Sequence, residues 1–99
     1  MAAFQASQVA VGTTAAELVS GLEGRYQIVV SNYTDTTVYL GSSGVTTGDG
    51  FALQPEYGST NGSSLTSVTL DVLLDSTDAL YAIAGYSGQG NVGVMVNPR

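Results

Sequence analysis

Hydrophobic and polar residues alternate along most of the chain with a period of about two, which is typical of β-strands that bury one face. The clearest alternation runs through residues 65–74. Its apolar positions share one face: Val68, Leu70, Val72 and Leu74. The opposite face is mainly polar, so we predict a strand with one face in a core and the other mostly in water.

The stretch from Arg25 to Leu53 is expected to be the centre of a sheet. Ile28 to Val30 is a β-branched run suited to a buried strand, and alternation resumes at residues 38–40. Between them, residues 32–36 are rich in Asn, Asp and Thr, which favour chain reversal. The pattern therefore predicts a hairpin of two paired strands. Val45 and Phe51 are expected to anchor the glycine-rich loop that follows.

The remaining apolar segments predict further short strands. Residues 4–11 alternate, residues 15–19 favour a short strand over a helical turn, and residues 91–96 alternate before Pro98. Ala79 to Ala84 is apolar on both faces, which is typical of a central strand. Residues 75–78 are expected to form a turn, and residues 85–90 a hairpin loop. Seven or eight strands, with turn signals about ten residues apart, predict an all-β sandwich or jelly roll of antiparallel strands.

Length and composition favour one folded domain spanning residues 1–99. The chain is 43% apolar and only 10% charged, the reverse of the composition expected for a disordered segment. Two segments are expected to stand apart from the sandwich. Met1 to Phe4 is a candidate N-terminal arm, and residues 54–64 are polar enough to predict a long exposed loop.

The charge balance argues against several classes of partner. Two arginines and no lysine stand against eight acidic residues, giving a net charge of −6. No basic footprint is available for a phosphate backbone or an anionic membrane surface, so we expect no nucleic-acid or membrane partner. Cysteine is absent, and no stretch resembles a signal peptide or a membrane span. We expect a soluble protein made in the cytoplasm.

The inventory of reactive side chains is poor. The chain has no histidine, cysteine or lysine, which removes Ser-His, Cys-His and Schiff-base chemistry. Asp71, Asp75 and Asp78 could form a carboxylate pair for glycoside hydrolysis, and Asp75, Ser76 and Asp78 could contribute to a calcium site. Aspartates in turns more often bond their own backbone, so we predict no enzymatic activity, no metal and no cofactor.

Tyrosine is the one residue type suited to binding that is unusually frequent: the chain has six tyrosines, two phenylalanines and no tryptophan. Tyr26, Tyr39 and Tyr81 fall in predicted strands, whereas the other three fall in loops. Tyrosine buries a large area at small entropic cost and so suits a contact surface. Single half-packed aromatic residues are the alternative interpretation. The candidate partner contacts are Phe4, Tyr33, Tyr57, Asn61 and Tyr86.

Several short motifs carry a resemblance to a known family. They are Val30-Ser31-Asn32, TVYLG at residues 37–41, SGVTT at 43–47, GFAL at 50–53 and ALYAIA at 79–84. Together they span about Val9 to Val96, and they resemble small structural proteins of tailed bacteriophages, namely head decoration or minor capsid proteins. The chain departs from the family pattern at residues 54–64, where a short Pro-Gly turn is usual.

The resemblance implies a function in the virion. It implies a β-sandwich subunit on the capsid exterior that binds the major capsid protein, reinforces contacts between shell subunits and assembles as a homo-oligomer, with a trimer favoured. Repeated copies on a symmetric shell would gain by avidity what one contact lacks. The alternative is a receptor- or glycan-binding module of a phage head or tail fibre, which would use the loop tyrosines and carboxylates.

Overall fold

A computed structural model describes residues 5–55, 66–86 and 90–99 of the chain. These residues form eight β-strands and no helix, which confirms the all-β prediction. The strands are β1 (Gln5–Val9), β2 (Ala16–Ser20), β3 (Gly24–Asn32), β4 (Val38–Gly41), β5 (Phe51–Leu53), β6 (Ser67–Leu74), β7 (Ala79–Ala84) and β8 (Val92–Pro98). The predicted arm at residues 1–4 and most of the predicted loop at 54–64 lie outside the described residues.

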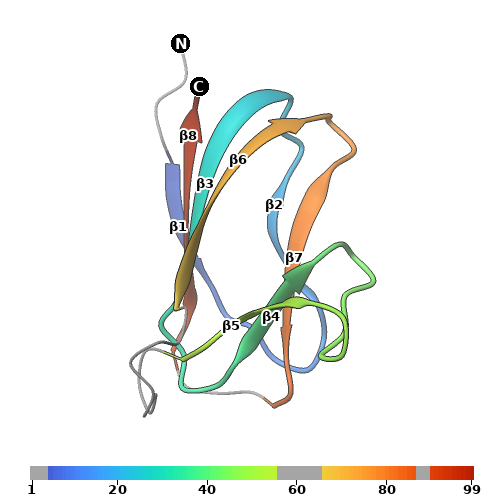
Figure 1. Ribbon diagram of the computed structural model, residues 1–99, viewed down its shortest axis with the longest axis vertical. Coiled ribbons are helices and arrows are strands. Elements are labelled where there is room, and N and C mark those ends of the chain that lie inside the picture. The colour runs from blue at the N-terminus through green and yellow to red at the C-terminus, as the bar shows by residue number, and fades with distance from the viewer. Residues whose placement is uncertain (1–4, 56–65, 87–89) are drawn as a thin grey trace.

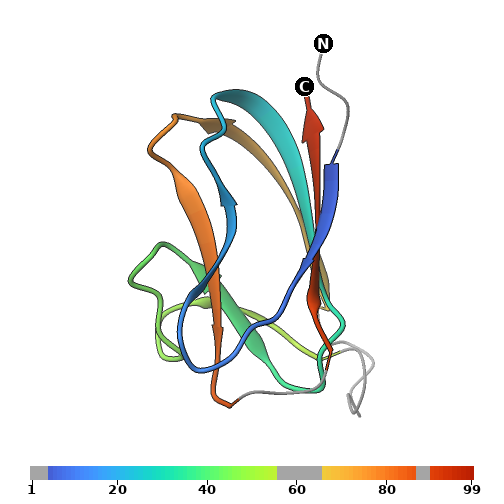
Figure 2. The same cartoon turned by 180° about the vertical axis from the view of Figure 1, so that it is seen from behind.

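The strands form two antiparallel sheets of four strands each. Their orders are β1-β8-β3-β6 and β2-β7-β4-β5. The two sheets face each other, as Figures 1 and 2 show from the front and from behind. The C-terminal end of β8 is at the top in both views. The predicted β-sandwich is therefore the observed architecture.

The strand pairing is that of a jelly roll. Four pairs are nested around the centre of the chain: β4 with β5, β3 with β6, β2 with β7, and β1 with β8. Successive pairs lie in alternate sheets, as though one long hairpin had been wrapped around the core. Pairing of β3 with β8 and of β4 with β7 then completes the two sheets. Of the two architectures predicted, this topology selects the jelly roll.

The two predicted hairpins are wrong. β3 and β4 lie in different sheets, and so do β7 and β8, so the connections 33–37 and 85–91 cross between sheets. Both connections carry ordinary turn residues, and alternation alone does not say which strand a turning chain will pair with. Among the described strands, only β4 and β5 are both consecutive in sequence and paired.

The core fills the space between the inner faces of the sheets. Val30, Val38, Leu53 and Val92 have no exposed surface, and Ala82 and Ala84 of β7 are 0% and 2% exposed. β7 lies between β2 and β4, as predicted for a strand that is apolar on both faces. The inward side chains of β6 are only half-buried, because β6 is an edge strand.

The loop between β4 and β5 has one apolar anchor rather than two. Val45 is 6% exposed, as predicted, but Phe51 is 52% exposed and does not anchor the loop. A methyl group added at Gly41 or at Gly50 would lie 2.8 Å from a Val45 methyl carbon. These glycines therefore provide the space that the Val45 side chain occupies, and no equivalent space holds Phe51.

A buried polar network lies where the chain leaves β3 and crosses to the other sheet. The Asn32 amide donates to the carbonyl oxygens of Thr36 and Leu53, both at 2.9 Å. Its Oδ1 accepts the backbone N–H of Thr34 at 3.0 Å and lies 2.6 Å from the Thr34 hydroxyl. That hydroxyl also accepts the backbone N–H of Thr36 at 3.3 Å. Asn32 and Thr34 are each 1% exposed, so these bonds are made away from water.

Truncation of a buried leucine is expected to lower the free energy of unfolding more than truncation of an exposed leucine. Leu53→Ala removes a side chain with 0% exposure, and the cavity should lower the free energy of unfolding by about 2–5 kcal/mol. Leu73→Ala, at a position that is 70% exposed, is the matched control and should change it by less than about 0.5 kcal/mol. Urea denaturation of both variants measures the difference. Equal losses would contradict the assigned core.

Removal of one hydroxyl tests the buried network. Thr34→Val keeps the side-chain shape but leaves the Thr36 N–H without its acceptor, which should cost about 1–3 kcal/mol of unfolding free energy. Thr69→Val makes the same change at an exposed position of β6 and should cost less than about 0.5 kcal/mol. The comparison uses the urea concentrations at the midpoint of unfolding of the two variants, analysed with the same m-value. A neutral Thr34→Val would show that the network contributes little.

Candidate functional site

Two of the five sequence-predicted contact residues lie in the described part of the chain. Tyr33 is 47% exposed and Tyr86 is 56% exposed, both in connections that cross between the sheets. Phe4, Tyr57 and Asn61 lie outside the described residues, so the prediction for them stays a prediction. Of the two described tyrosines, Tyr33 lines a surface pocket, and the candidate site is built around it.

The outer face of the β1-β8-β3 sheet provides the floor of this pocket. Strand register places Ala6, Met95 and Val29 in one row across the three strands. The next row consists of Gln8, Gly93 and Ser31. Because Gly93 has no side chain, the second row is hollow at its centre.

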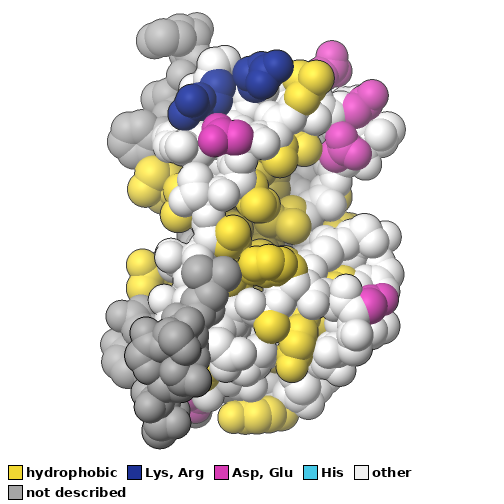
Figure 3. Space-filling view, in the orientation of Figure 1, with side chains coloured by type: hydrophobic (Ala, Val, Ile, Leu, Met, Phe, Trp, Pro, Cys, Tyr) yellow, Lys and Arg dark blue, Asp and Glu magenta, His cyan; other side chains and the backbone are white. Residues whose placement is uncertain are grey.

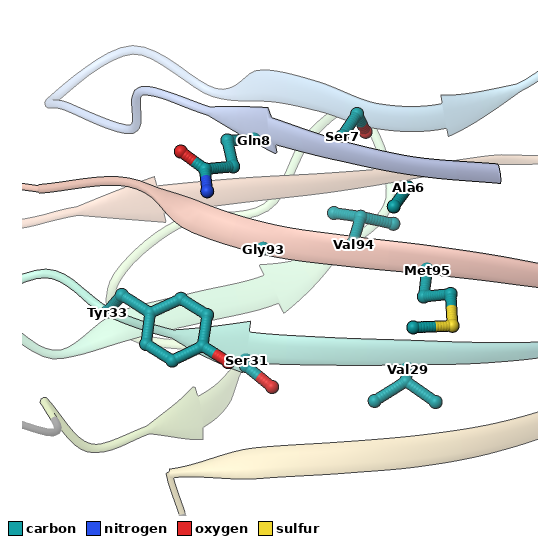
Figure 4. Close-up of a pocket in the computed structure, with 9 residues that line it drawn as sticks. All are labelled: Ala6, Ser7, Gln8, Val29, Ser31, Tyr33, Gly93, Val94 and Met95. Atoms are coloured by element: carbon teal, nitrogen blue, oxygen red, sulfur yellow. The ribbon is translucent and has the colours of Figure 1, made fainter.

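The Tyr33 ring lies against this hollow. A methyl group added at Gly93 would lie 2.9 Å from ring carbon Cε2 and 3.3 Å from Cδ2. Figure 4 shows the ring reaching from the end of β3 towards Gly93 and Ser31, with Met95 and Val29 farther along the strands. A glycine within a strand often marks such a close approach. The ring packs here in space that any other residue at position 93 would occupy.

The backbone of Tyr33 is fixed on both sides. Its N–H donates to the carbonyl of Asn91 at 3.1 Å, which ties the β3–β4 connection to the β7–β8 connection. The residues that flank it in the chain, Asn32 and Thr34, belong to the buried network. Gly90 approaches so closely, at φ of 90°, that a side chain there would collide with the Tyr33 carbonyl oxygen. Tyr33 is therefore an exposed aromatic residue on a rigid support.

The pocket is a shallow hollow of about 410 Å³ on the sheet surface. Its rim combines the Tyr33 ring and Met95 with the polar side chains of Gln8 and Ser31. The Gln8 amide oxygen accepts a hydrogen bond from Asn91 at 3.3 Å. None of the residues that line the pocket is charged, so it suits a neutral surface of a partner: apolar groups against the ring, and hydroxyl or amide groups along the polar side.

Sequence reasoning found Tyr33 but missed the residues around it. Ser31, Met95 and Gln8 belong to strands far apart in the sequence, and only the observed register brings them together. One signal was available in the sequence. Gly93 interrupts a run of alternating valines, and an isolated glycine in a strand often indicates that another group approaches the backbone.

Two of the three aspartates considered for catalysis or metal binding, Asp75 and Asp78, hold a turn together, whereas Asp71 lies within β6, 3.9 Å from Arg99. Asp78 Oδ2 accepts the backbone N–H of Asp75 at 2.8 Å, and Asp75 Oδ1 accepts that of Thr77 at 3.3 Å. Across residues 5–55, 66–86 and 90–99, no group of three or more histidine, cysteine, aspartate or glutamate side chains is placed to hold a metal ion. The same residues include no helix long and apolar enough to cross a membrane.

Comparison with known proteins adds no relative to this description. No protein family, curated protein or solved structure matches the chain.

A substitution at Gly93 is expected to move the tyrosine without unfolding the protein. In Gly93→Ala the new methyl group occupies ring space, so the Tyr33 side chain must swing away while the strand keeps its pairing. Nuclear Overhauser contacts between the Tyr33 ring and residue 93 should disappear, with the circular dichroism spectrum unchanged. Gly85→Ala, where nothing lies within 4 Å of the added carbon, is the control and should leave the ring in place. An unmoved ring in Gly93→Ala would contradict the packing described.

Proposed function

We propose that this chain is a non-enzymatic structural protein of a bacteriophage virion, which decorates the capsid exterior and reinforces it by binding the major capsid protein. A homo-oligomer, with a trimer favoured, would present several copies of the Tyr33 pocket to neighbouring shell subunits. The affinity of each single contact can then be low, because linked contacts raise the total affinity by avidity.

Three features support this proposal. The sequence motifs resemble those of small phage structural proteins. The jelly roll is a fold used by viral capsid and lectin domains, although this support is an analogy of fold and not of site. The third feature is chemical. The chain lacks histidine, cysteine and lysine, and the pocket lining has no charged group. A surface of this kind binds by shape and hydrogen bonds.

The observation that carries the proposal is the fixed, exposed position of Tyr33. Residues that dominate protein interfaces are often aromatic side chains held rigidly before binding, since little entropy is then lost on contact. Tyr33 is 47% exposed, while its two neighbours in the chain are 1% exposed and hydrogen-bonded.

The position and number of copies on the particle test this proposal. Labelling of purified particles with a gold-conjugated antibody against the chain, together with quantitative mass spectrometry, should find many copies spread over the shell. A few copies confined to a vertex or a tail would contradict decoration.

Loss of the Tyr33 ring should weaken particle binding. The binding assay uses virus particles from which this protein is absent. Tyr33→Ala is expected to reduce the affinity of the purified protein for these particles by at least about tenfold, equivalent to about 1.4 kcal/mol. Tyr86→Ala is the comparison, since Tyr86 is the other candidate contact in the described residues, is more exposed, and lines none of the described pockets. Co-sedimentation with particles measures both. Equal effects of the two substitutions would show that Tyr33 is not the anchor.

The second candidate function is recognition of a cell-surface glycan by a phage head or tail fibre. The observation that favours it is the composition of the same pocket, where an aromatic ring lies beside the amide group of Gln8 and the hydroxyl group of Ser31. Sugars offer an apolar face and hydroxyl groups to such a surface. Binding of the pure chain to an array of bacterial surface glycans, abolished by Tyr33→Ala, would favour recognition over decoration.

A further inference from the structure

The edge strand β6 differs from the other three edges of the sandwich. β6 has 8 residues, whereas β1 and β2 have 5 each and β5 has 3. β2 is also interrupted by a bulge between Glu17 and Val19. Proteins commonly protect edge strands by making them short or bulged. β6 has neither protection, and its register with β3 runs without a shift from Ser67 to Leu74.

The open side of β6 carries a row of backbone groups that no described strand pairs with. Asn32 donates its backbone N–H to the Thr66 carbonyl at 2.9 Å at the start of the β3–β6 ladder. Because hydrogen-bonded pairs alternate along an antiparallel ladder, the even-numbered residues of β6 bond to β3 and the odd-numbered residues point their N–H and C=O groups away. The outward residues are Ser67, Thr69, Asp71 and Leu73.

An apolar groove opens beside this edge, between the two sheets. It consists of adjoining hollows of about 200, 380 and 450 Å³. The first two share Leu70 and Leu80, and the last two share Leu73, Leu74 and Asp78. Figure 3 shows hydrophobic side chains gathered along the middle of this face. Phe51, at 52% exposure, lines the end of the groove that is nearest β5.

The opposite end of the groove is acidic. Glu23, Asp75 and Asp78 line its last hollow, and all three residues are exposed. Figure 3 shows acidic side chains gathered at the upper right end of the same face. The groove therefore runs from an apolar end to a cluster of three carboxylates. A second copy of this chain, with its own net charge of −6, would be repelled there.

We propose that β6 and the adjoining groove bind an extended segment of a partner protein as an added antiparallel strand. The segment has apolar residues at alternate positions and one or more basic residues at its N-terminal end. Its backbone pairs with the odd-numbered residues of β6, and its apolar side chains cover Leu70, Leu80 and Phe51. Antiparallel pairing places its N-terminus beside Asp75 and Asp78, which follow β6 in the chain.

This surface is separate from the Tyr33 pocket, so it does not depend on the proposed function. The two share no lining residue. The pocket lies on the outer face of the sheet, whereas the groove lies between the sheets at the β6 edge. A partner strand seated on β6 would leave Tyr33 accessible.

A designed peptide tests the proposal directly. The probe is a synthetic peptide of 8 residues, the length of β6, with two arginines followed by alternating valine and threonine. Titration into the isotope-labelled full chain should shift the amide resonances of Thr69, Asp71 and Leu73. A peptide with two glutamates in place of the arginines should bind at least about tenfold more weakly, and one with the arginines moved to its C-terminus should also bind more weakly.

Two variants locate the contact. Thr69→Pro removes an outward-facing N–H while leaving the bonds to β3, so it should reduce peptide affinity at least about tenfold. The double variant Glu23→Gln with Asp78→Asn should reduce it about threefold or more, because the lost ion pairs are exposed. Glu17→Gln is the control, since this carboxylate lines none of the three hollows, and affinity should not change.

Several outcomes would overturn the proposal. One is the absence of amide shifts at β6 with the arginine peptide, a result that requires no variant and so does not depend on whether Thr69→Pro folds. Equal affinity for the arginine and glutamate peptides would refute the role of the acidic end. Sedimentation that shows self-association of the chain, abolished by Thr69→Pro, would assign the edge to a second copy instead.

Discussion

The side chain of Asn32 connects parts of the molecule that the apolar core alone would not hold in one arrangement. Asn32 ends β3 in one sheet, and its amide donates to Leu53, which ends β5 in the other. It also donates to Thr36 in the segment that crosses between them. Burial of apolar surface is non-directional, so by itself it does not specify that β3 and β4 lie in different sheets. The amide bonds have fixed directions, and away from water they must be made.

The network also organises the end of the sandwich that carries the Tyr33 pocket. The connections after β3 and β7 meet there, since the backbone of Tyr33 bonds to that of Asn91. The buried network includes Asn32 and Thr34 on either side of Tyr33, so the position of the Tyr33 ring depends on that network. The opposite end holds both arginines, with Arg99 3.9 Å from Asp71, and the carboxylates beside the β6 groove. The two candidate surfaces therefore differ in chemistry as well as in place.

The sequence predicted the strands far better than their partners. The apolar pattern located seven of the eight strands, and alternation was the main signal because a strand with one buried face needs a period of two wherever it lies in the fold. The exception is β5, where Phe51 was expected only to anchor a loop. Pairing depends on contacts between distant residues, so the turn at 32–36 gave no sign that β3 and β4 would separate. Tyr33 was identified by its residue type alone. Its pocket was not, since Gln8, Gly93 and Ser31 meet only through register. Phe51 was misplaced because hydrophobicity does not reveal whether a matching cavity exists.

The pH dependence of an Asn32→Asp variant tests most directly whether this network holds the two sheets together. The substitution places a carboxylate against the carbonyls of Thr36 and Leu53, so burial and repulsion should raise the pKa of the introduced group above the usual value of about 3.9. A raised folded-state pKa costs stability as pH rises above the unfolded value. Urea unfolding should therefore show a deficit relative to the native chain that is large at neutral pH and shrinks towards about pH 4. Asn97→Asp replaces a part-buried amide that donates to the Gln27 side chain at 3.2 Å, and it should show a smaller deficit. A deficit for Asn32→Asp that is absent, or the same at every pH, would contradict the account.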